Sequence, residues 1–119
     1  MNIDTLSAAL NLAWAVASSD EMNDAEWDVL FKEMKSFNLT DEQKERVVNR
    51  FKAMSVLEAI NVINASDDAT RDEAEALIAV TILADKEFSD QEKGALRLMR
   101  QLCKFRGISY EDAHRILGF

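Results

Sequence analysis

The sequence has 119 residues, of which 48% are hydrophobic and 30% are charged, so it is long enough to bury a core and too apolar for a disordered chain. Its 14 basic and 22 acidic residues give a net charge of −8, which excludes non-specific binding to nucleic acid because the phosphates would repel the protein. There is no proline, and the three glycines all follow residue 93, so the composition predicts an all-α fold and excludes a sandwich of hairpins.

The first predicted helix covers residues 5–18 and contains the stretch LNLAWAVA. This stretch is apolar nearly all round, as expected of a helix surrounded by other helices. It is also shorter than the roughly 20 residues that cross a bilayer, and the acidic start of the chain is unlike a secretory signal. We therefore expect a cytoplasmic protein without direct membrane insertion.

Capping boxes predict where six further helices begin, because their side chains bond the free amides of a first helical turn. The boxes are Asn23 with Glu26, Thr40 with Gln43, Ser55 with Glu58, Thr70 with Glu73, Ser89 with Glu92 and, in a weaker form, Ser109 with Asp112. The predicted helices are about 24–37, 41–53, 56–65, 71–85, 90–106 and 110–117. Connections of two to five residues between them predict one domain, 1–119.

The helix at 71–85 resembles the first one, since its segment ALIAVTILA is also apolar nearly all round. We predict that these two helices lie at the centre of a bundle of about seven short helices. The predicted centre of the core consists of Leu6, Leu10, Trp14, Leu77, Ile78 and Ile82.

Each of the two apolar helices runs into an acidic turn and then into a capped amphipathic helix: AVASSDEMNDAEW in the first copy and LADKEFSDQEK in the second. One extra residue in the second copy aligns the two turns. The recurrence predicts an internal pseudo-repeat of two equivalent halves. The aligned pairs are Asp20 with Asp85, Met22 with Phe88, Asn23 with Ser89, Asp24 with Asp90 and Glu26 with Glu92.

The acidic turns contain two kinds of carboxylate. Those that open a helix, such as Asp90 and Glu92, are explained by the positive end of the helix dipole. Asp20 and Asp85 instead follow the C-terminal end of a helix, where a carboxylate is unfavourable unless a left-handed cap, a cation or a basic side chain compensates it. Oxygen ligands suit Ca²⁺, Mg²⁺ or Mn²⁺, so a divalent-cation site is one hypothesis. Its candidate ligands are Asp20, Glu21, Asp85 and Glu87.

A basic stripe follows one side of the predicted helix 90–106, at spacings of four, three and four residues. It consists of Lys93, Arg97, Arg100 and Lys104. In an acidic protein this stripe predicts either a docking face for an acidic protein partner, a second copy included, or a solvated helix face.

No sequence pattern indicates an enzyme. Cys103 lies beside the apolar face of its helix and is interpreted as a small buried side chain, and His114 has no partner in sequence for a zinc site or an acid–base pair. Glycine-rich phosphate loops and Ser-His-Asp arrangements are also missing from the sequence.

The doubled pattern of a buried helix ending in Asp, a hydrophobic residue, a cap and a Glu resembles the TerB-like family over about residues 6–118. That family takes in tellurite-resistance protein B and the N-terminal domain of the co-chaperone DjlA. The resemblance implies a compact helical bundle whose paired acidic turns are suspected of binding divalent metal. The family turn is usually Asp-Gly, whereas Lys86 follows Asp85 here and Glu21 follows Asp20.

The resemblance implies a non-catalytic binding or scaffold domain, linked to stress responses such as tellurite resistance and acting through protein contacts. The alternative is a metal-binding or metal-sensing domain. The sequence leaves open the identity of the partner and whether the protein forms a homodimer.

Overall fold

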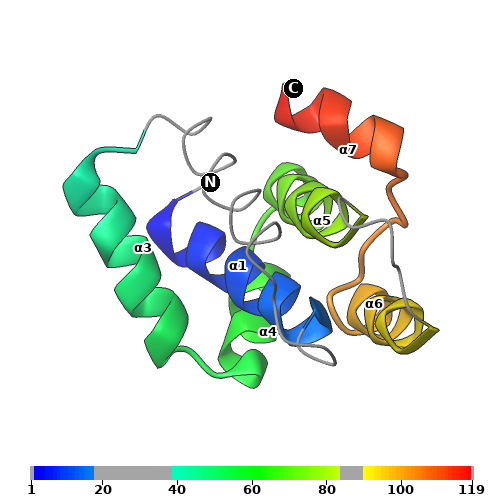
Figure 1. Ribbon diagram of the computed structural model, residues 1–119, viewed down its shortest axis with the longest axis horizontal. Helices are drawn as coiled ribbons and strands as arrows, with labels where there is room; N and C mark the ends of the chain where they lie inside the picture. The colour runs from blue at the N-terminus through cyan, green and yellow to red at the C-terminus, as the bar shows by residue number, and fades with distance from the viewer. Residues whose placement is uncertain (1, 18–38, 84–89, 119) are drawn as a thin grey trace.

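The computed structural model describes residues 2–17, 39–83 and 90–118. Every regular element in these ranges is a helix (Figure 1). In chain order the helices are α1 (Ile3–Ala17), α3 (Asp41–Ala53), α4 (Val56–Asn64), α5 (Asp68–Leu83), α6 (Asp90–Leu102) and α7 (Tyr110–Leu117). The prediction of an all-α fold is confirmed. The predicted helix 24–37 and both acidic turns of the pseudo-repeat lie outside the described residues.

Helix α1 is the centre of the bundle and packs against α3, α4, α5 and α6 (Figure 1). All nine residues from Thr5 to Ala13 are buried, and so are the nine from Ala74 to Ile82 in α5. A helix can be buried on every side only when several neighbours surround it, which is the arrangement that the apolar sequences predicted. None of the described helices is both long enough and apolar enough to cross a membrane.

Five of the six side chains predicted at the core centre are at most 5% exposed, whereas Trp14 is 39% exposed. The prediction for Trp14 is therefore wrong. Its side chain leaves α1 toward Phe51 near the end of α3, where the rings meet edge to face at a centroid distance of 5.8 Å. Leu12 and Ile63 fill the main core instead and are fully buried.

A second, smaller apolar cluster joins α7 to α5. In it Ala76, Ala79 and Val80 of α5 meet Ile108 and Ala113, with Ile116 and Leu117 partly buried at its edge. Small side chains on α5 let the short α7 approach closely. Helix α7 thus packs on α5 and lies away from α3 (Figure 1).

Three of the predicted caps form as expected. Thr40 and Gln43 make both bonds of a capping box, while Ser55 and Ser109 each accept from the third amide of their helices. The predicted cap of α5, Thr70, is wrong. The capping side chain is Asp67, which accepts a hydrogen bond from the Thr70 amide at 2.8 Å, and α5 begins at Asp68. An Asp is as good a cap as a Thr, and the earlier cap adds a further turn to the helix.

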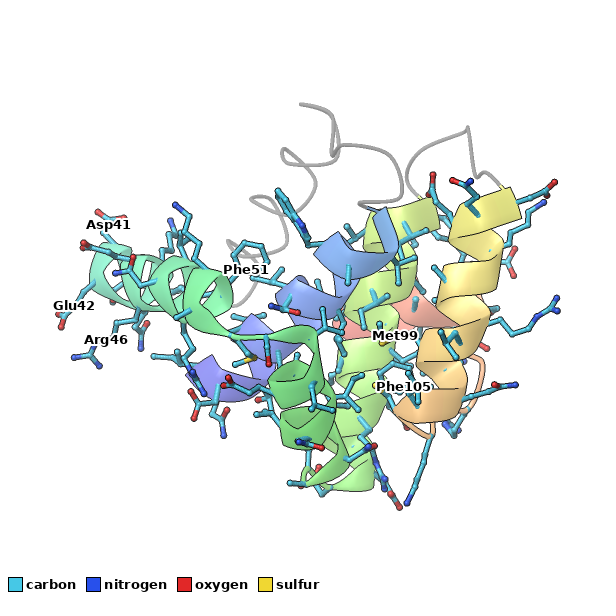
Figure 2. All side chains as sticks on the ribbon, turned by 90° about the horizontal axis from the view of Figure 1, so that it is seen from below. Asp41, Glu42, Arg46, Phe51, Met99 and Phe105 are labelled. Carbon is cyan, nitrogen blue, oxygen red and sulfur yellow. The ribbon has the colours of Figure 1, made fainter. Side chains whose placement is uncertain are left out.

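Helix α6 ends at Leu102, four residues before the predicted end. Lys104 adopts a left-handed conformation with φ of 55°, and the Phe105 amide donates to the Arg100 carbonyl at 2.9 Å. This is a Schellman ending, in which glycine is the usual left-handed residue. Since a lysine occupies that position, the sequence shows no sign of the ending. Phe105 then packs against the main core near Met99 (Figure 2).

Candidate binding sites

The candidate metal ligands Asp20, Glu21, Asp85 and Glu87 lie outside the described residues. Of the carboxylates predicted to open α6, Asp90 is exposed and Glu92 is buried. Within the described ranges, no group of three or more acidic, histidine or cysteine side chains is placed to hold a metal ion. The divalent-cation hypothesis at residues 20, 21, 85 and 87 stays a prediction.

The basic stripe divides into two parts in the folded protein. Arg100 turns inward and donates from Nε to Glu75 at 3.0 Å and from a terminal nitrogen to the Ile108 carbonyl at 3.0 Å. The Nζ atom of Lys93 lies 3.8 Å from Oδ1 of Asp90 on the same helix. Arg97 and Lys104 are exposed and make no ion pair within the part of the chain that the structure describes.

Arg100 pairs with Glu75. This glutamate is fully buried, although it is an acidic residue in an otherwise apolar stretch of α5. Its carboxylate also accepts from the backbone amides of Gly107 at 3.0 Å and Ile108 at 2.8 Å. Gly107 has φ of 84°, a conformation that glycine adopts without strain. Glu75 therefore ties the connection between α6 and α7 to the centre of α5.

Sequence reasoning missed Glu75. The one signal in the sequence was the position of this glutamate between Ala74 and Ala76, at the start of the apolar segment. The structure shows that both alanines are buried. A glutamate at such a position needs several donors, and the sequence does not show which ones reach it.

Exposed apolar side chains also lie on α6, the helix that carries Arg97. Leu98 is 56% exposed and Leu102 is 46% exposed, four residues apart on one helix face. Leu96 and Met99 lie on the buried face of the same helix, and Cys103, directly after the helix, is buried too. We call Arg97, Leu98 and Leu102 of α6, together with Lys104 two residues beyond its end, the α6 face.

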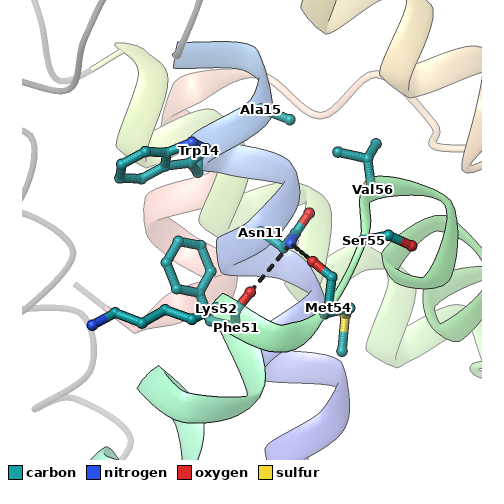
Figure 3. Close-up of a pocket in the computed structure, with 8 residues that line it drawn as sticks. All are labelled: Asn11, Trp14, Ala15, Phe51, Lys52, Met54, Ser55 and Val56. Carbon is teal, nitrogen blue, oxygen red and sulfur yellow. Dashed lines mark hydrogen bonds between the residues drawn. The ribbon is translucent and has the colours of Figure 1, made fainter.

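A groove of about 730 Å³ runs between α1 and the connection from α3 to α4 (Figure 3). Its apolar walls are Trp14, Ala15, Phe51, Met54 and Val56. Asn11 lines it as well and is 9% exposed.

Asn11 fixes this part of the fold through its side-chain amide. Its Nδ2 donates to the Met54 carbonyl at 2.7 Å and more weakly to the Phe51 carbonyl at 3.4 Å. Two carbonyl acceptors on one side of the amide set its orientation, because only nitrogen can donate to them. Oδ1 consequently points away from both carbonyls, toward the space between Ala15 and Val56 (Figure 3). It is buried and has no hydrogen-bond partner among the described residues.

Cys103 is fully buried and lies 3.8 Å from the Met99 sulfur. Burial raises the pKa of its thiol to about 11, since the charged thiolate is disfavoured away from water. Its interpretation as a small buried side chain is confirmed. His114 is partly buried and meets the Tyr110 ring edge to face at 4.4 Å.

No protein-family model matches this chain, and no curated protein is significantly similar to it. Among solved structures, the fold is similar to the crystal structure of a protein of unknown function from Porphyromonas gingivalis, with a TM-score of 0.81 and 17% sequence identity. The match covers 98% of this chain and 97% of that chain. At this identity the similarity shows a shared fold.

Proposed function

We propose that the protein is a non-catalytic binding domain that acts through protein–protein contacts, with the α6 face as its docking surface. The observation that carries the proposal is the exposure of Leu98 and Leu102 on the helix that also carries Arg97, with Lys104 two residues beyond its end. Neither cation makes an ion pair within the described ranges. Apolar anchors flanked by charge are typical of protein interfaces.

The expected partner is an acidic segment with apolar side chains. The leucines supply burial, and the cations favour carboxylates and disfavour basic partners. A second copy of this chain also qualifies, since its net charge is −8. Arg100 is left out of the proposed contact because its guanidinium already binds Glu75 and the Ile108 carbonyl.

A non-catalytic role agrees with the burial of Cys103 and Glu75, two side chains that could otherwise act as a nucleophile and a base. The Cys103 thiol is protonated at neutral pH because burial raises its pKa. The Glu75 carboxylate accepts three donors from Arg100, Gly107 and Ile108 and is shielded from solvent. Neither group is available as a nucleophile or a base.

The test reverses the charge of the α6 face with the double variant Arg97→Glu/Lys104→Glu. The matched control is Lys44→Glu/Arg46→Glu, which makes the same change in charge on α3. The unmodified chain is expected either to capture proteins from cell extract or to form a dimer in sedimentation velocity. We expect this binding to be lost in the first variant and kept in the control. Equal capture and equal mass for all three proteins would disprove the docking role.

A divalent-cation site is the alternative function, favoured by the recurrence of a carboxylate after both apolar helices. Its proposed ligands are Asp20, Glu21, Asp85 and Glu87, and the proposed ions are Ca²⁺, Mg²⁺ and Mn²⁺. Calorimetric titration of chelator-treated protein tests it, with Asp20→Asn/Asp85→Asn as the variant and Asp41→Asn/Glu42→Gln as the control. Heat that is lost only in the first variant supports a site, and no heat with any of the ions rejects it.

Three finer proposals accompany this function: seven helices arranged as two pseudo-equivalent halves, TerB-like membership with a role in stress responses, and a cytoplasmic location. Their support is the doubled sequence pattern and the apolar helices that are too short to span a bilayer. A deletion strain that grows normally on tellurite and under oxidative or envelope stress would remove the stress-response proposal.

A further inference from the structure

The groove beside Asn11 has features of a ligand site that the α6 face does not share. Its volume of about 730 Å³ is within the range of small-molecule pockets, roughly 300–1,000 Å³. Such pockets combine mostly apolar walls with a few fixed polar groups. This groove has five apolar lining residues and an amide whose orientation is set by two backbone carbonyls.

The unsatisfied acceptor is the first indication of what binds. A buried oxygen without a hydrogen bond costs about 1 to 3 kcal/mol, so a donor that reaches it gains more than the same donor does in water. Oδ1 of Asn11 points between Ala15 and Val56 (Figure 3). Val56 is 44% exposed at the start of α4 and forms the outer wall on that side. An N–H or O–H group inserted past Val56 meets an acceptor that has no partner among the described residues.

The walls indicate the body of the ligand. Trp14 and Phe51 meet edge to face, and Trp14 remains 39% exposed. Aromatic rings prefer offset or edge-to-face contacts with other rings, so an aromatic ligand extends this pair and covers exposed apolar surface. A lone water molecule would satisfy Oδ1 and leave the exposed parts of Trp14 and Val56 in contact with solvent.

The charge at the rim indicates the far end of the ligand. Lys52 lines the groove, is exposed and makes no ion pair within the described part of the chain. Its ammonium group lies beyond Phe51, on the side away from Asn11 (Figure 3). A carboxylate at the end of a short linker therefore complements Lys52 while the donor faces Asn11.

We infer that the groove binds a small aromatic carboxylate that carries an N–H or O–H donor. Asn11 accepts the donor, Trp14 and Phe51 contact the ring, and Lys52 pairs with the carboxylate. The site is independent of the α6 face, so either proposal can fail without the other.

The test titrates the full chain with indolepropionate and follows amide chemical shifts by two-dimensional NMR up to the solubility limit of the ligand. We expect saturable shifts at residues of the groove, including the side-chain amide protons of Asn11. Naphthylpropionate has the same shape without the N–H donor and is expected to bind about fivefold more weakly. Tryptamine carries an ammonium group in place of the carboxylate and is expected to bind more weakly by about threefold or more.

Two variants with matched controls locate the site. Val56→Trp fills the groove and is expected to weaken binding by about tenfold or more, whereas Leu57→Trp, on the neighbouring and 69% exposed side chain, leaves it unchanged. Lys52→Glu is expected to weaken binding by about threefold, and Arg46→Glu, which points outward from the same helix, leaves it unchanged (Figure 2). Lys52 is exposed, so its variant remains folded even where Val56→Trp does not.

Saturable shifts that depend on the N–H donor and on Val56 support the inference. The absence of saturable shifts, or shifts that are the same in Val56→Trp and Leu57→Trp, would overturn it. Equal affinity for the indole and naphthyl compounds would overturn the role of Asn11 and leave the groove as an apolar surface.

Discussion

Asp67 shows how one residue sets where a helix begins. Its carboxylate accepts the amide of Thr70, and this hydrogen bond is the main cause that lowers the pKa of Asp67 below 3.8. Because the folded state binds the proton less tightly than the unfolded state does, the cap stabilises the protein fully above the ordinary pKa. That contribution is lost as the pH falls through the lowered pKa.

Asp67→Ala is therefore expected to lower the unfolding midpoint in urea at pH 7, with a difference from the unmodified protein that shrinks as the pH falls below about 3.8. Asp67→Asn keeps an acceptor at the cap and serves as the control. Urea unfolding at several pH values measures both. A deficit in Asp67→Ala that stays constant down to pH 2 would contradict the cap as its cause.

Cys103 is expected to resist thiol reagents at pH 8, because its thiol is both buried and protonated. The unfolded chain ionises its cysteine near pH 8.5 to 9, so folding stability contributed by this group is lost as the pH rises from about 9 toward 11. Labelling with a chromogenic disulfide measures the rate, with urea-unfolded protein as the reference. Equal rates in the folded and unfolded states would show that the thiol is accessible.

At the scale of elements, the end of α6 carries a lysine where glycine is favoured. A left-handed conformation costs a non-glycine residue about 1 to 2 kcal/mol. Lys104→Gly is thus expected to raise the free energy of unfolding by about 1 kcal/mol. Gln101→Gly lies inside the same helix and is expected to lower it by about 0.5 to 1 kcal/mol. Urea denaturation measures both, and a loss of stability in Lys104→Gly would contradict the Schellman ending.

The connection from α6 to α7 depends on Glu75, which joins α5 to three donors from outside that helix. Glu75→Gln keeps the size but removes the negative charge beside Arg100, and its amide NH2 replaces Oε1, which accepts from the Gly107 amide at 3.2 Å. We expect a loss of about 2 to 3 kcal/mol in the free energy of unfolding. Glu111→Gln, which is exposed at the start of α7, is expected to change stability by less than about 0.5 kcal/mol. A loss in Glu75→Gln no larger than in this control would show that the buried network does not stabilise the fold.

At the scale of the whole molecule, two apolar clusters divide the bundle unequally. The main cluster joins α1, α3, α4, α5 and α6, whereas α7 is attached by the small cluster on α5 and by the Glu75 network. An eight-residue helix is unstable alone, so within the described part of the chain α7 depends on these contacts.

We expect amide hydrogen exchange in α7 to occur by local opening, with a lower free energy than exchange in α1 and α5. Helix α4 has nine residues but packs on α1 in the main core, so it is the matched comparison and is expected to be better protected. Exchange followed by mass spectrometry over a series of low urea concentrations measures each helix. Equal protection of α7 and α1 would mean that the bundle opens as one unit.

The sequence by itself determined the helical class, the two buried helices and the caps at Thr40, Ser55 and Ser109. These features depend on local periodicity and on side chains that bond amides within one turn, so neighbours in sequence suffice. Only the tertiary structure decided that Trp14 faces outward, that Arg100 turns inward to Glu75 and that the Asn11 oxygen has no hydrogen-bond partner among the described residues. Each of those outcomes depends on which helix lies opposite, and a residue's own helix does not contain that information.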